Sequence, residues 1–81
     1  MRMLDSEAKR SVRTLQLYVS PAEAANLRDA LIRLLTDPEA NEHEHVFCDH
    51  SAREMSLSIV TSAKLAARRY TALEQAILDE K

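Results

Sequence analysis

The chain has 81 residues, of which 46% are hydrophobic and 30% are charged, and its formal net charge is −2. This length allows one domain with a thin core, and no apolar run approaches the ~20 residues that a membrane span requires. The slightly acidic balance disfavours a general nucleic-acid binder, which is usually basic. The single cysteine excludes an internal disulfide, so we expect a soluble protein of the reducing cytoplasm.

The chain contains no glycine. Phosphate-binding loops and dinucleotide fingerprints are therefore excluded, because both need glycine where the backbone approaches a ligand closely. Turns with a positive φ must use other residues, and Asn41 and Asp49 are the candidates. We expect an N-terminal segment at 1–11 that could be flexible, followed by a single α+β domain at 12–81.

Residues 12–19, VRTLQLYV, predict the first strand because apolar and polar side chains alternate with a period of two. A helix start follows directly. Ser20 is the expected N-cap, Pro21 suits the first helical position, and Glu23 is placed to complete a capping box. Leucines then recur at helical spacing as far as the sequence TDP at 36–38, where proline disfavours further helix.

Two further strands are expected at 43–49 and 53–61, which are rich in aromatic, β-branched and alternating apolar residues. They predict a hairpin with a loop of several residues, because no glycine is present for a tight turn. The tail is helical, but its start is ambiguous. Ser62 could cap one long helix, whereas Thr71 with Glu74 forms a second capping-box match.

The predicted order is β-α-β-β-α, a small three-stranded sheet with the helices packed on one face. The other face of the sheet would then be uncovered. Tyr18, Val60 and either Val46 or Phe47 would form an apolar patch there, which predicts self-association, most simply as a homodimer.

The stretch EHEHVFCDH at 42–50 contains all three histidines and the only cysteine. On a strand, His43 and His45 share a face, Cys48 points to the other face, and His50 joins only if the strand bulges or ends early. Structural zinc typically takes four protein ligands and catalytic zinc three, whereas one strand face supplies two. We therefore expect no cofactor. The alternative is a zinc site of His43, His45, Cys48 and His50, or a metal shared between two copies.

Two other functions have weaker support. A nucleophilic pair of Cys48 and His50 needs the base within hydrogen-bond reach of the thiol and a group that orients the base, so we expect no enzyme. Arg68 and Arg69 beside Tyr70 could bind phosphate or stack on a base, but two arginines on a helix usually form a solvated face.

The order of these features resembles the small immunity proteins of bacterial polymorphic toxin systems. The resemblance covers residues 14–61: a leading strand, SPAEAANLRDALIRLL as a leucine-rich first helix, NEHEHVFCD as an H-x-H strand, and REMSLSIV as a polar-then-aliphatic hairpin strand. The usual glycine between the two later strands is missing here. The residues from Ala63 onward match no part of the pattern.

The resemblance implies a non-enzymatic, cytoplasmic bacterial protein that binds and neutralises a cognate toxin. An acidic segment at 37–44 beside an exposed strand would attract a basic partner. The residues expected to contact that partner are Glu42, His43, Glu44, His45, Phe47 and Tyr18. The alternative function is a small cytoplasmic metal-binding or regulatory domain that uses the His/Cys cluster at 43–50.

Overall fold

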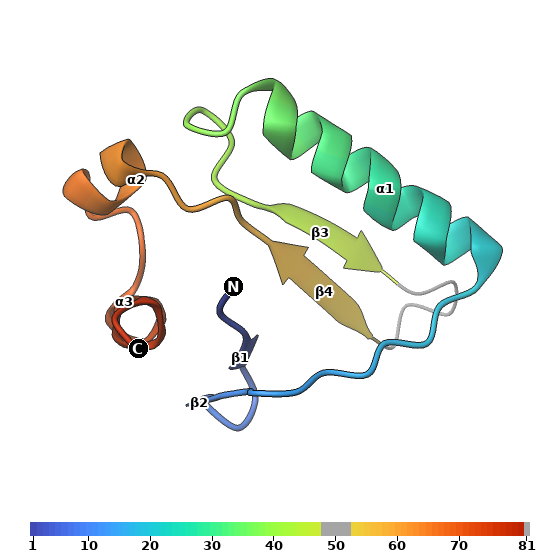
Figure 1. The fold of residues 1–81 in the computed structure, drawn as a ribbon, viewed down its shortest axis with the longest axis horizontal. Coiled ribbons are helices and arrows are strands. Elements are labelled where there is room, and N and C mark those ends of the chain that lie inside the picture. Colours follow the sequence, from blue (N-terminus) through green and yellow to red (C-terminus); the bar gives the residue numbers. More distant parts are fainter. Residues whose placement is uncertain (48–52, 81) are drawn as a thin grey trace.

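The computed structural model describes residues 1–47 and 53–80, and within these it contains two small antiparallel sheets and three helices (Figure 1). This confirms the α+β class. None of the described helices is long and apolar enough to cross a membrane. In chain order the elements are β1 (Leu4–Asp5), β2 (Arg10–Ser11), α1 (Pro21–Thr36), β3 (Glu44–Phe47), β4 (Glu54–Leu57), α2 (Ser62–Ala66) and α3 (Ala72–Leu78).

Helix α1 begins at the predicted capping box. The Glu23 N–H donates to Ser20 Oγ at 3.1 Å, and the Ser20 N–H donates to Glu23 Oε1 at 2.9 Å. Pro21 occupies the first helical position, where its missing N–H leaves no helical hydrogen bond unmade. The helix ends at Thr36, before Pro38, so both predicted ends of this helix are confirmed.

Strands β3 and β4 form the predicted antiparallel hairpin, in which β3 begins one residue later than predicted, at Glu44, and β4 is shorter than predicted, at Glu54–Leu57. Their register is Glu44↔Leu57, His45↔Ser56, Val46↔Met55 and Phe47↔Glu54. The predicted loop at 50–52 and the predicted strand positions Cys48 and Asp49 lie outside the described residues. Helix α1 runs alongside β3, so that one face of the hairpin is half-buried and the other exposed (Figure 1).

The segment 14–19 differs from the predicted first strand. It runs as an extended connection past β4 into α1, but it belongs to neither sheet (Figure 1). The N-terminal segment 1–11 contains the additional β1–β2 hairpin instead, so the order is β-β-α-β-β-α-α and each sheet has two strands. The physical reason is that alternation predicts an extended backbone, whereas pairing also needs a neighbouring edge in register.

The tail forms two helices, α2 and α3. Helix α3 begins at the second predicted capping box, with Thr71 as N-cap and Glu74 as its reciprocal partner. The N-cap of α2 is Thr61, one residue before the candidate Ser62. Arg68, with φ of 54°, makes the turn between the two helices. Asn41 does not have a positive φ, so that prediction was wrong.

The apolar core is small. Among the described residues, the buried apolar side chains are those of Ala30, Leu34 and Ile77. The fourth buried side chain is that of Lys64, whose Nζ donates to the Ile59 carbonyl at 2.8 Å. Most of the chain's large apolar residues are therefore in contact with solvent, where a partner could cover them.

Candidate partner-binding surface

The exposed face of the β3–β4 hairpin carries a row of rings. The ring centroids of His43 and His45 lie 4.6 Å apart at an interplanar angle of 89°. The centroids of His45 and Phe47 lie 6.1 Å apart at 24°. These side chains share a face because alternate strand residues point the same way. We call this surface the ring face; it consists of His43, His45, Phe47 and the cross-strand neighbours Ser56 and Glu54.

Two side chains of β4 contact the His45 imidazole. Ser56 Oγ lies 2.9 Å from His45 Nδ1, and Glu54 Oε2 lies 3.3 Å from the same nitrogen. Both partners come from β4 positions that face the same side of the hairpin as His45. Because both contacts use Nδ1, the ring is oriented with its other nitrogen free of hydrogen bonds to the described residues, where an incoming group could bind it.

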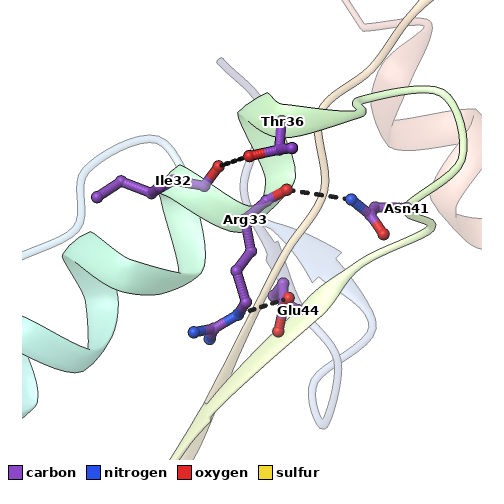
Figure 2. A network of polar contacts seen from close by, with 5 residues as sticks. All are labelled: Ile32, Arg33, Thr36, Asn41 and Glu44. Carbon is purple, nitrogen blue, oxygen red and sulfur yellow. Dashed lines mark hydrogen bonds and ion pairs between the residues drawn. The ribbon is translucent and has the colours of Figure 1, made fainter.

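Glu44 points to the opposite side of the hairpin, toward α1. Its Oε1 accepts a hydrogen bond from Arg33 Nε at 2.9 Å, as Figure 2 shows. Asn41 Nδ2 donates to the Arg33 carbonyl at 3.1 Å, and Thr36 Oγ1 donates to the Ile32 carbonyl at 2.9 Å (Figure 2). Glu44 therefore joins β3 to the last turns of α1, and the structure places it apart from the ring face.

Two acidic residues lie near the row of rings. Glu42 is exposed immediately before His43, and its carbonyl accepts a hydrogen bond from Ser58 Oγ at 2.8 Å. Glu54 is exposed opposite Phe47 on β4, and its Oε2 lies beside the His45 imidazole. The prediction that the acidic segment 37–44 attracts a basic partner stays a prediction, and Glu54 on β4 is an acidic residue that it did not include.

Tyr18, another of the predicted contact residues, is 86% exposed. It lies on the segment 14–19, and no hydrogen bond or ring contact joins it to the ring face within the described residues. Phe47 and Val60 are also exposed, whereas Val46 is half-buried on the α1 side. Of the two candidates for the apolar patch, Phe47 is therefore the exposed one.

A groove of about 230 Å³ lies between α1 and β3 beside the ring face. One basic and one acidic side chain line it, so the groove has no strong preference for a charged small molecule. It offers space in which a side chain of a bound protein could be accommodated. Its lining residues are Asn26, Asp29, Arg33, His45, Val46 and Phe47.

The zinc alternative depends on His43, His45, Cys48 and His50. His43 and His45 lie next to each other and would supply two imidazoles. Within 1–47 and 53–80, no group of three His, Cys, Asp or Glu side chains is placed to hold a metal ion. The other two proposed ligands, Cys48 and His50, lie outside the described residues, so this alternative stays a prediction.

Sequence inspection missed Glu54 and Ser56 on β4 and the groove residues of α1, which are Asn26, Asp29 and Arg33. The signal for the first two was the polar half of the alternation in REMSLSIVT, which predicts a shared exposed face on β4. Which residue lies opposite His45 depends on the hairpin register, and that register is set by the loop. Asp29 could be found only once α1 was placed beside β3.

No protein-family model, curated protein or solved structure matches this chain. The resemblance to immunity proteins accordingly rests on the residues quoted for it.

Proposed function

We propose that this chain is a non-enzymatic protein-binding module that neutralises a bacterial toxin, as the resemblance to immunity proteins implies. The observation that carries the proposal is the ring face, where two imidazoles and a phenyl ring are exposed side by side on a hairpin whose other face packs against α1. The protein would act in the bacterial cytoplasm.

The ring face has the composition that favours protein contacts. Aromatic side chains are enriched among the residues that dominate binding energy, because they bury much area at little cost in side-chain entropy. His45 is already fixed by Ser56 and Glu54, so less freedom is lost when a partner covers it. Phe47, at 55% exposure, is the apolar side chain of the row that a partner would cover.

The charges around the row indicate the chemistry of the partner. Glu54 places a carboxylate beside His45, Glu42 directly precedes His43 in the chain, and no lysine or arginine lies within the row. Such an arrangement attracts a basic surface and speeds encounter, more than it adds affinity. A toxin that acts on nucleic acid would present such a surface, since it must bind phosphates.

Growth rescue tests this function directly. Candidate basic toxin domains from the same genome are expressed one at a time in a sensitive bacterium, with or without this chain. We expect the chain to restore growth against one of them. We expect the double variant His45→Ala/Phe47→Ala to lose the rescue because it removes the centre of the ring face.

The matched control is Leu65→Ala, which truncates an exposed apolar residue on α2, away from the ring face. It should rescue growth as well as the natural chain. Circular dichroism must show that both variants are folded. Rescue that survives in the double variant, or no rescue by the natural chain against any candidate, would contradict the proposal.

A further inference from the structure

We propose that residues 14–18, within the extended segment 14–19, form a strand that pairs with residues 14–18 of a second copy of this chain, antiparallel about a two-fold axis at Gln16. This interface is separate from the ring face. The inference does not rest on the inhibitor function, and its tests measure association of the chain with itself.

The backbone of residues 14–19 makes no hydrogen bond within the described part of the chain. Backbone hydrogen bonds resume on both sides of the segment. The Val12 N–H donates to the Met3 carbonyl at 2.9 Å, and the Ala24 N–H donates to the Ser20 carbonyl at 2.8 Å. An extended row of unpaired N–H and C=O groups is a template for a strand from another chain.

The side chains of this segment do nothing to prevent such pairing. Edge strands that must stay unpaired usually carry charged residues or proline, yet residues 14–19 contain neither. Leu15, Leu17 and Val19 are 55%, 48% and 45% exposed, and they alternate along the segment. Apolar side chains in this pattern are those of a strand with one covered face.

The sequence of the segment is complementary to itself. In an antiparallel pair centred on Gln16, Leu15 of each copy lies opposite Leu17 of the other, and Thr14 lies opposite Tyr18. Four leucines then meet on one face, and aromatic–β-branched pairs form on the other. No like charges face each other. A two-fold interface requires this property, because each copy must offer the same patch to the other.

Pairing with a second copy would also increase the small amount of apolar surface that this chain buries. Ala30, Leu34 and Ile77 are the only apolar residues buried within the described chain. A domain of this size buries a comparatively small share of its surface even when it is compact. Self-pairing covers apolar area of the segment in two copies at once, without a further protein being present.

Replacing Gln16, at the two-fold axis, by residues of either charge tests the interface. Gln16 is exposed, so Gln16→Lys and Gln16→Glu leave the monomer's packing intact, but each places like charges opposite one another in the dimer. In sedimentation velocity we expect a dimer for the natural chain and a dissociation constant raised about fivefold or more for each variant. An equimolar mixture of the two variants should restore the dimer, because opposite charges then meet.

Thr14→Lys is the matched control, because its lysine faces Tyr18 of the other copy and not another lysine. It should dimerise more tightly than Gln16→Lys. A natural chain that stays monomeric at high micromolar concentration would overturn the inference. So would Gln16 variants that dimerise as the natural chain does.

Cross-linking supplies an independent measurement. In a Cys48→Ser background, Gln16→Cys places two thiols opposite each other on strands whose paired Cα atoms are about 4.5–5.5 Å apart, within disulfide range. Thr14→Cys would place its two thiols about 13 Å apart along the strands. We expect mild oxidation to give a covalent dimer for residue 16 and not for residue 14. Equal cross-linking at both positions, or none at 16, would contradict the register.

Discussion

Lys64 is a charged residue in an unusual position, because its side chain is buried. Its side chain is only 1% exposed, although lysine is rarely buried without a charged partner. Its Nζ donates to the Ile59 carbonyl at 2.8 Å, and no carboxylate contacts it within the described residues. Its methylene stem is buried together with the ammonium group, so we expect packing of the stem to contribute more to stability than the charge does.

Exchange of Lys64 for a residue of similar length separates these two contributions. Lys64→Met keeps the stem and removes the buried charge, so we expect the free energy of unfolding to stay within about 1 kcal/mol or to rise. Lys64→Ala leaves a cavity and should lower it by about 2 kcal/mol. Urea unfolding followed by circular dichroism measures both. If Met destabilised as much as Ala, the ammonium group itself would be the stabilising element.

At the scale of elements, the sequence was sufficient to predict those features that depend on residues close together in the chain. The capping boxes at Ser20 and Thr71 each involve residues three apart, so the sequence predicted both. The same holds for the shared face of His43, His45 and Phe47, which follows from strand geometry alone.

Long-range pairing was not predictable in this way. Residues 14–19 have the pattern of a strand, but whether they pair depends on an edge that approaches from elsewhere in the chain or from another molecule. Glu44 was placed among the contact residues because it neighbours the histidines, and its bond to Arg33 on α1 became visible only with the helix in position. Among the described residues, the positive φ values fell at Lys9 and Arg68, where tight turns required them, and not at Asn41.

The cap of α1 gives a prediction at this scale. Ser20→Ala removes the side-chain acceptor for the Glu23 N–H and should lower the free energy of unfolding by about 1 kcal/mol. Ser62→Ala is the control, because the side chain that caps α2 is that of Thr61, and it should change stability by less than about 0.5 kcal/mol. If both variants lowered the free energy of unfolding equally in denaturant, the Ser20 cap would contribute no more to stability than the uncapped position Ser62.

The whole molecule is less compact than its length allows. Its radius of gyration is 13.4 Å, whereas a compact domain of this length would have about 12 Å. Its shortest extent is 19 Å, so the molecule is thin as well as small. Three buried apolar residues among those described, an unpaired strand-like segment and an exposed row of rings all support the proposal that this chain associates with other molecules.

Native mass spectrometry of the chain purified from its own cells without chelator tests this account most directly, because one spectrum gives the partner, the copy number and any bound metal. We predict a complex with a basic protein, without stoichiometric zinc, that is lost in His45→Ala/Phe47→Ala and kept in Leu65→Ala. A zinc-loaded assembly of this chain alone, whose metal is lost in His43→Ala/His45→Ala, would contradict the account and establish the histidines as metal ligands.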